Sequence, residues 1–426
     1  MVPGLNVQPL PAMCVSLFCL PIAARRFAAR RFAAGALAAV AAIAWGAPAP
    51  DHSGVPGVVI AHSPKSTRVF LGSAGIAILP DGTYLAKHDE FGPGSSEQAS
   101  AVTRVYRSAD RGATWVPSSR IDGLFWATVF AHRGAVYLLG TTAGHRHGHC
   151  VIRRSTDGGR TWTEPKDEHT GRLFPDISYH TAPVPVVVHQ GRIWRAMEDE
   201  KGGTKWGLMF RAFMLSAPED ADLLVASHWT ASNALPHDPA YLGGRFGGWL
   251  EGNAVVDPAG RIVNVLRVDH RALPEKAAII RISADGREAT FDPARDFVDL
   301  PGGCKKFVIR PDPRDGRYWT LANAVLPAHR DGNVERIRNA AVLMSSTDLR
   351  AWTPHHVALY HGNTASHGFQ YLDWQFDGED LVVAARTAFD DGIGGADNQH
   401  NSNYLTFHRL ERFRRHVGDR VELAQP

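Results

Sequence analysis

The chain has 426 residues, of which 44% are hydrophobic and 21% are charged, and its formal net charge is +3 at pH 7. These proportions are those of ordinary folded proteins, so they exclude a disordered chain and a body embedded in a membrane. The charges are mixed in sign and form no basic block, which argues against nucleic acid as a partner. The length exceeds that of an average domain, but a propeller or barrel can fill it as a single unit.

The first 49 residues have the pattern of an export segment. Two pairs of arginines precede an Ala-rich apolar run over residues 32–45, which the sequence A-P-A follows. The run is shorter than the ~20 residues that span a bilayer, and its small-residue end is typical of a cleavage site. We therefore expect residues 1–49 to be a signal peptide that exports residues 50–426, a single domain, to the periplasm or extracellular space without integral membrane association. An uncleaved anchor, a misassigned start, and the Sec and twin-arginine routes stay open.

Cysteine, histidine and carboxylate spacings do not indicate a metal site. Outside the export segment only Cys150 and Cys304 remain, and both a disulfide between them and two free buried thiols are open. The histidines of residues 145–149 are more typical of a solvated loop than of a zinc site. The carboxylates of residues 390–397 lack EF-hand spacing, so a calcium ion has no motif in its favour. We expect no metal and no required cofactor.

One unit recurs along the chain: an apolar run, a turn containing glycine and a second apolar run. It occurs six times, around Gly82, Gly134, Gly191, Gly260, Gly316 and Gly378. Val, Ile, Tyr and Trp on both sides of each turn indicate β-hairpins, and a spacing of roughly 50 to 70 residues suits one four-stranded propeller blade each. We therefore expect an all-β, six- or seven-bladed β-propeller of four-stranded antiparallel blades. A β-sandwich is the alternative, but it would need unusually long connections.

A second unit supports the propeller. Residues 108–115 read SADRGATW and residues 155–162 read STDGGRTW, while residues 346–352 read STDLRAW, a copy that lacks one residue and the glycine. These segments resemble the Asp-box, S-x-D-x-G-x-T-W, of the sialidase superfamily. In such a turn Asp and Ser accept bonds from nearby amides, Gly supplies an unusual φ and Trp packs between blades. The resemblance implies a sialidase-like propeller and leaves the chemistry open.

Polar residues gather where the expected strands approach the propeller axis. The inner strand of a blade starts near the axis on one face and the second strand returns there, so residues at these points converge. The expected ring comprises Ser73, Trp126, His180, Glu251, Asn253, Lys306, Tyr371, Asp373, His88, Asp89, Glu198, Arg267, Asn323 and Arg386. Its cations and histidines suit an anionic sugar, because arginine binds a carboxylate bidentately and histidine or tyrosine moves a proton. The structural alternatives are an ion pair between Glu251 and Arg267 and solvated charges at Lys306 and Arg386.

Part of this ring resembles the catalytic machinery of sialidases. Glu251 and Arg267 are similar to the catalytic glutamate and the second arginine of the carboxylate clamp. Arg338 is similar to the third clamp arginine, and Tyr371 lies where the nucleophilic tyrosine is expected. The first clamp arginine is absent, since LGSAGI stands in place of the family's Arg-Ile-Pro motif. This departure puts ordinary exo-sialidase activity in doubt.

A second departure lies in the segment KHDEFGPG, which replaces the family's acid/base aspartate segment and introduces His88 beside Asp89. With SYHTAPVPV and HGFQYLDWQFDGEDLVVAARTAF, it is similar to propeller enzymes that act on rhamnosyl-glucuronate ends of acidic plant polysaccharides. Some of those enzymes are lyases and some are hydrolases. This resemblance implies an exo-acting enzyme that cleaves an acidic, uronate-containing oligosaccharide or polysaccharide, and we expect it to be a monomer.

The resemblance implies β-elimination as the leading reaction. Arg267 and Arg338 would hold the carboxylate, His88 or His180 would take the C5 proton, and Tyr371 or the other histidine would protonate the leaving oxygen. The further residues expected to bind substrate are Asp89, Asn253, Lys306, Arg386 and His400.

Two other functions stay open. One is hydrolysis, as in an exo-α-sialidase, with Tyr371 as the nucleophile, Glu251 as its activator and Asp89 or His88 as the acid/base. The other is a non-catalytic glycan-binding propeller, because a fold does not fix a function.

Overall fold

The computed structural model describes residues 48–426. The predicted export segment lies almost wholly outside the described residues and stays a prediction. Within residues 48–426 no helix has the length and apolar character needed to cross a bilayer.

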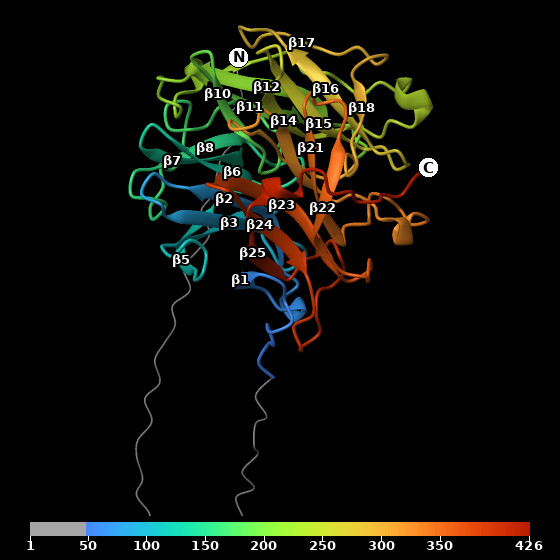
Figure 1. Cartoon of the computed structure of the whole chain (residues 1–426). Helices are drawn as coiled ribbons and strands as arrows, with labels where there is room; N and C mark the ends of the chain where they lie inside the picture. The colour runs from blue at the N-terminus through green and yellow to red at the C-terminus, as the bar shows by residue number, and fades with distance from the viewer. Residues whose placement is uncertain (1–47) are drawn as a thin grey trace, which may run out of the picture. The chain divides into compact units, whose positions relative to one another are not determined.

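Six antiparallel sheets form the six blades of a propeller (Figure 1). Blade 1 contains β2 (Phe70–Ile78), β3 (Tyr84–Phe91), β4 (Val102–Ser108) and β5 (Val116–Asp122). Blade 2 contains β6 (Phe125–His132), β7 (Ala135–Thr141) and β8 (Cys150–Ser155). Blade 3 contains β10 (Val186–His189), β11 (Arg192–Asp199), β12 (Arg211–Pro218) and β13 (Thr230–Ala231), with β9 (Tyr179–His180) beside β11. Blade 4 contains β14 (Trp249–Val256), β15 (Ile262–Val268), β16 (Lys276–Ile282) and β17 (Ala289–Thr290), with β18 (Phe297–Asp299) beside β16. Blade 5 contains β19 (Ile309–Pro311), β20 (Tyr318–Ala322), β21 (Ala340–Ser346) and β22 (Thr353–Tyr360). In the described part of the chain the helical segments are five short 3-10 turns, η1 (Lys65–Thr67), η2 (Ala226–His228), η3 (Tyr241–Gly244), η4 (Pro327–His329) and η5 (Phe413–His416).

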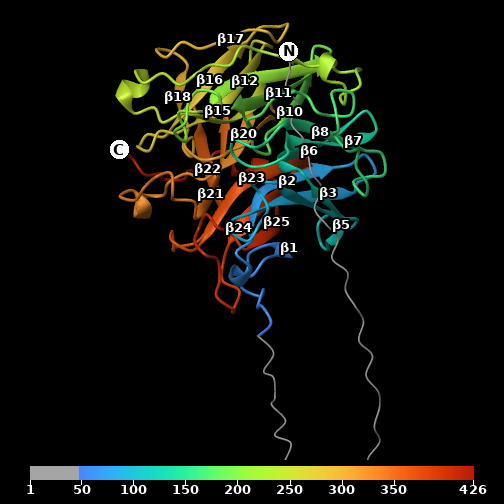
Figure 2. The ribbon, with the colours of Figure 1, turned by 180° about the vertical axis from the view of Figure 1, so that it is seen from behind.

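The sixth blade closes the ring by joining both ends of the domain. It contains β23 (Gly368–Asp377), β24 (Asp380–Ala388), β25 (Tyr404–Leu410) and β1 (Val58–His62). Strand β1 pairs antiparallel with β25, and both views show the two strands side by side (Figures 1 and 2). Unfolding the last blade therefore also requires release of the first strand. The predicted all-β propeller is confirmed, with six blades.

The predicted hairpins are the first two strands of the successive blades. Their six turn glycines have φ between 66° and 81°, the left-handed region that side chains with a Cβ disfavour. Large aromatic residues pack on and between the blades, and Trp194, Trp249, Trp319 and Trp374 are almost fully buried. Burial of such side chains contributes about 1.5–3 kcal/mol each, so the blade contacts supply much of the stability.

The turns at residues 108–115 and 155–162 make matching hydrogen bonds. In the first, the Gly112 amide donates to Ser108 (2.8 Å) and the Thr114 amide donates to Asp110 (2.9 Å). The second repeats both bonds at the same distances. Trp115 packs against Phe407 of the last blade, with ring centroids 5.5 Å apart. The first of these turns therefore contacts the neighbouring last blade. Cys150 and Cys304 are both buried and free, so the disulfide alternative is wrong.

A ring of buried polar side chains links each blade to the next. In chain order, the amides of Ile76, Trp126, Val184, Gly252 and Ile309 donate to Asp373 (2.9 Å), Asp89 (2.7 Å), Thr128 (3.0 Å), Glu198 (3.1 Å) and Asn253 (3.0 Å), and Asn323 donates to the Phe369 carbonyl (2.6 Å). Each bond supplies a partner for a buried backbone group of the neighbouring blade. All six junctions between blades are therefore tied by at least one polar side chain.

Candidate active site

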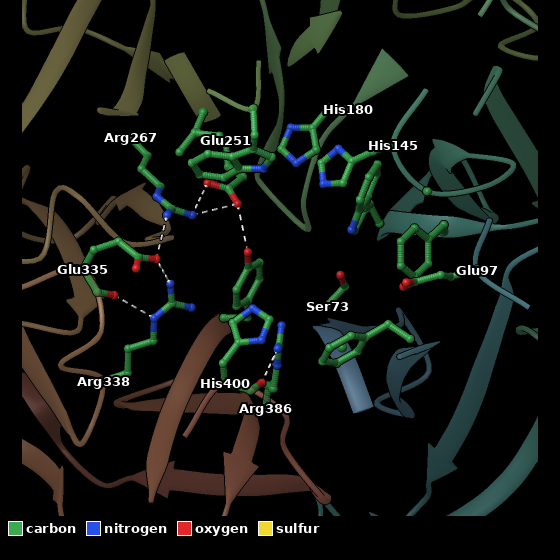
Figure 3. Close-up of a pocket in the computed structure, with 18 of the residues that line it drawn as sticks. Ser73, Glu97, His145, His180, Glu251, Arg267, Glu335, Arg338, Arg386 and His400 are labelled. Atoms are coloured by element: carbon green, nitrogen blue, oxygen red, sulfur yellow. Dashed lines mark hydrogen bonds and ion pairs between the residues drawn. The ribbon is translucent and has the colours of Figure 1, made fainter. Parts of the chain in front are cut away.

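A cavity of about 430 Å³ lies where the inner strands begin (Figure 3). Four inner strands, β2, β6, β14 and β23, shift register there and form β-bulges. The bulged residues Ser73, Trp126 and Tyr371 have φ of 43°, 52° and 51°. A bulge re-aims the side chain that it carries. These residues, and Glu251 at the fourth bulge, line the cavity.

Tyr371, Glu251 and Arg267 form the centre of the site. The Tyr371 hydroxyl donates to Glu251 Oε1 at 3.0 Å, and Arg267 Nη1 lies 3.1 and 2.9 Å from the two carboxylate oxygens. Burial alone would raise the pKa of Glu251, but the charges of Arg267 and His180 and the hydrogen bonds from Arg267 and Tyr371 together lower it. Burial and the Glu251 carboxylate raise the pKa of Tyr371. At neutral pH the pair is thus a protonated phenol bonded to an ionised carboxylate.

A second acid, Glu335, lies between two arginines of the cavity. Its Oε1 is 3.6 Å from Arg267 Nη2 and also accepts a hydrogen bond from Arg338 Nη2. Arg338 Nη1 donates to Gln370 at 2.7 Å. Burial opposes ionisation of Glu335, but the two guanidinium groups lower its pKa below the usual value. The two arginines that the sialidase resemblance assigns to a substrate carboxylate therefore already share an internal one (Figure 3).

Histidine and aromatic rings form the opposite wall. His180 Nδ1 lies 3.3 Å from Glu198, and the ring packs 4.7 Å from Trp126 and 5.3 Å from His145 between centroids. His145 lies in the predicted loop with 35% of its side chain exposed, and it also bonds to Glu200 and lines the cavity. Among residues 48–426 no cluster of His, Cys, Asp or Glu has the arrangement of a metal site.

Seven predicted site residues line the cavity. They are His180, Glu251, Arg267, Arg338, Tyr371, Arg386 and His400. Their placement agrees with the expected convergence of strand ends, while their chemical roles stay predictions.

His88 does not line the cavity, and its predicted place in the site is wrong. The side chain is buried, with Nε2 3.1 Å from the Tyr106 hydroxyl and Nδ1 3.2 Å from the Asp89 carbonyl. Successive residues of a strand point to opposite faces, and His88 lies on the face of β3 that packs against other protein groups. Burial lowers the pKa of His88 to about 3, so the ring is neutral.

Asp89, Asn253 and Lys306 were also expected to bind substrate, and the structure gives them other partners. Asp89 and Asn253 belong to the ring that ties the blades together. Lys306 is buried and donates from Nζ to the Leu372 carbonyl at 2.8 Å. None of the three lines the cavity of the described domain. Hydrogen bonding to the backbone of the next blade, rather than to a ligand, explains why these polar residues occupy inner strands.

Loop residues missing from the prediction complete the cavity. Glu335 follows η4, and Glu97 follows β3, so both lie outside strand ends. Burial raises the pKa of Glu97. Figure 3 shows Glu97 on the far side of the cavity from Arg267 and Glu335. No periodic signal marks either residue, since loop length and path decide where each carboxylate lies.

Comparison with known proteins identifies similar folds but no family. No protein-family model matches the sequence, and no curated protein is similar to it at a significant level. Several solved structures share the fold: an α-L-arabinanase of Penicillium chrysogenum has a TM-score of 0.52 and 15% identity, covering 84% of this chain and 98% of that chain. A GH93 α-L-arabinofuranosidase of Fusarium graminearum has a TM-score of 0.53 and 12% identity over the same shares. A Trypanosoma rangeli sialidase has a TM-score of 0.54 and 14% identity, covering 82% of this chain and 55% of that one.

These likenesses define the fold as a sialidase-like propeller. Identities of 12–15% carry no statement about activity. The predicted resemblance to the rhamnosyl-glucuronate group stays a prediction.

Proposed function

We propose that this protein is an exported, exo-acting glycoside hydrolase that removes an acidic sugar from the end of a glycan. The observation that carries the proposal is the 3.0 Å hydrogen bond from Tyr371 to the ionised Glu251 at the cavity. A cavity of about 430 Å³ is in the size range of small-molecule sites, which suits a chain end. The similar folds include an arabinanase, an arabinofuranosidase and a sialidase, all of which act on sugars.

In the first step the Tyr371 oxygen attacks the anomeric carbon while its proton passes to Glu251. The bond to the leaving oxygen breaks, and that oxygen takes a proton from Glu97. In the second step water attacks the glycosyl-tyrosine, gives its proton to the Glu97 carboxylate, and Tyr371 recovers its proton from Glu251. The sum is one glycosidic bond and one water consumed, as in retaining enzymes. Arg267 holds Glu251 in place throughout.

Glu97 gives this mechanism a pH dependence. The role of acid requires a protonated carboxyl, and burial raises the pKa of Glu97, which keeps the proton on to higher pH. Activity should therefore fall as the pH rises through that pKa. We expect Glu97→Gln to remove this alkaline limb and to slow substrates with poor leaving groups about 10²–10⁴-fold. On aryl glycosides with good leaving groups kcat/KM should be much less affected, because it reports the first step, whereas kcat should still fall because the second step needs the Glu97 base. Equal losses of kcat/KM on both substrate types would contradict the assignment.

The experiment for the whole proposal is product analysis across a panel of oligosaccharides capped with uronate, sialate or neutral sugars. We expect release of a terminal acidic monosaccharide. Binding of these glycans without any product would instead support the non-catalytic alternative. Release from neutral caps alone would contradict the acidic substrate class.

A lyase reaction is a second candidate, favoured by His180 in the wall of the cavity, because a histidine ring can act as a base. The His180 ring lies 3.3 Å from Glu198 through Nδ1 but makes no hydrogen bond to it. It would take the C5 proton of a uronate while Tyr371 protonates the leaving oxygen. The product would carry a C4–C5 double bond and absorb in the ultraviolet. Bond cleavage without new absorbance would eliminate this candidate.

Substitution of His88 distinguishes the predicted catalytic role from the structural role that its buried position indicates. We expect His88→Ala to destabilise the fold by about 1–3 kcal/mol, because the Tyr106 hydroxyl loses its buried partner and a small void forms. The turnover rate of the folded protein should stay within a factor of a few. Thermal unfolding and a rate assay on the same samples check both parts. A large loss of rate with unchanged stability would restore the predicted catalytic role.

A further inference from the structure

Five arginines line the cavity, and one of them differs from the rest. Four form ion pairs within the domain: Arg267 with Glu251 (2.9 Å), Arg271 with Asp269 (2.9 Å), Arg336 with Glu335 (3.0 Å) and Arg338 with Glu335. Arg386 has no acidic side chain within 4.0 Å among residues 48–426. It is therefore the lining guanidinium whose charge no described residue neutralises.

Arg386 is also short of hydrogen-bond partners. Its side chain is buried, with 4% of the residue exposed, and within the described domain its hydrogen bond runs from Nη2 to the His400 carbonyl. Nε is buried and has no partner there. A buried charged group without partners is costly, and native proteins rarely keep one unless a ligand completes it.

Two aromatic rings fix the position of this guanidinium. Its carbon lies 4.4 Å from the centroid of Phe91 and 5.0 Å from that of Tyr371. The rings stabilise a cation through their faces but bring no counter-charge. Burial, reinforced by the Arg338 charge, lowers the pKa of Arg386 to about 9. A bound anion would supply the missing counter-charge and raise the pKa of Arg386 again.

We propose that Arg386 is the residue that recognises the carboxylate of the substrate. This inference rests on the proposed function for the choice of an acidic sugar, and it replaces the predicted clamp of Arg267 and Arg338. Glu251 and Glu335 already occupy those two guanidinium groups, and their charges would repel a second anion placed there. A planar guanidinium that has no acidic partner fits a carboxylate.

The position of Arg386 also selects which sugar carries the acid. Because its guanidinium stacks on the ring of Tyr371, a bound carboxylate lies next to the attacking group. The acidic sugar is therefore the terminal unit that is cleaved, rather than a neighbour further along the glycan. Tyr371 thus takes part both in substrate selectivity, through its contact with Arg386, and in catalysis.

The test measures binding of D-glucuronate, D-galacturonate and N-acetylneuraminate, each against its own methyl ester, by ligand-observed NMR. We expect wild type to bind at least one acid about tenfold or more tightly than its ester, and Arg386→Met to lose that preference. Met replaces a buried cation with an apolar chain of similar length, so the fold should survive, as circular dichroism would show. Arg386→Lys should retain part of the preference.

Arg336→Met is the matched control. Arg336 lines the same cavity, but its side chain is 55% exposed and pairs with Glu335, so the preference should persist. No acid preference in wild type, or a preference that survives Arg386→Met, would overturn the inference. So would an equal loss in both methionine variants. Acid binding through Arg386 without glycan cleavage would leave the inference standing and reject the proposed hydrolase instead.

Discussion

Replacing Tyr371 by phenylalanine is expected to lower the rate of glycan cleavage at least about 10³-fold while leaving the fold intact. The change removes one oxygen, the atom that donates to Glu251 at 3.0 Å and that attacks the sugar in the proposed mechanism. Single-turnover kinetics on the cleaved glycan would measure the loss. Binding should change little, because the ring that stacks on Arg386 remains.

Tyr106→Phe is the control for this substitution. It removes the same atom from a tyrosine whose hydroxyl contacts His88, away from the cavity. We expect its rate to stay within a factor of a few of wild type. A Tyr371→Phe variant as active as Tyr106→Phe would remove the nucleophile from the mechanism.

Replacing Asp89 by alanine is expected to destabilise the domain by about 3–5 kcal/mol. Asp89 is fully buried, lies 3.0 Å from the Lys87 ammonium and accepts bonds from the Trp126 amide (2.7 Å) and the Thr103 hydroxyl (2.7 Å). Alanine would leave the buried Lys87 without its partner and the Trp126 amide unsatisfied, while the Thr103 hydroxyl would keep the Leu124 carbonyl as an acceptor (2.8 Å). Denaturant unfolding measures the change in the free energy of unfolding.

The same substitution distinguishes the two roles considered for Asp89. A residue that ties blades should lower stability, whereas a residue that binds substrate should raise KM with stability unchanged. Asp331→Ala, at a side chain that is 98% exposed, is the control and should change the free energy of unfolding by less than about 0.5 kcal/mol. Unchanged stability in Asp89→Ala would contradict the ring of ties between blades.

The fold could be predicted well from sequence because its signals are local. Each turn glycine, such as Gly82 or Gly378, needs a positive φ, and the apolar runs beside it mark a hairpin. The number of blades could not be predicted, because it depends on the pairing of β1 with β25 across the whole chain. No local pattern in residues 58–62 indicates which strand they pair with.

The candidate site was predictable only in part. Convergence of strand ends placed Tyr371, Glu251 and Arg267 correctly, since propeller topology alone brings those ends together. The prediction for His88 failed because successive residues of a strand point to opposite faces, and the sequence does not show which face of β3 the His88 side chain lies on. Glu335 was missed because its place depends on a loop path, and it changes the charge of the whole arginine cluster.

Mass spectrometry of the products formed in water labelled with heavy oxygen tests the central claim most directly. The substrates would be reducing-end-tagged oligosaccharides with acidic caps, and the Tyr371→Phe variant would serve as the blank. The proposed mechanism predicts that wild type releases a terminal acidic sugar carrying one solvent oxygen. An unsaturated product without solvent oxygen, or no cleavage of any acidic cap, would contradict it.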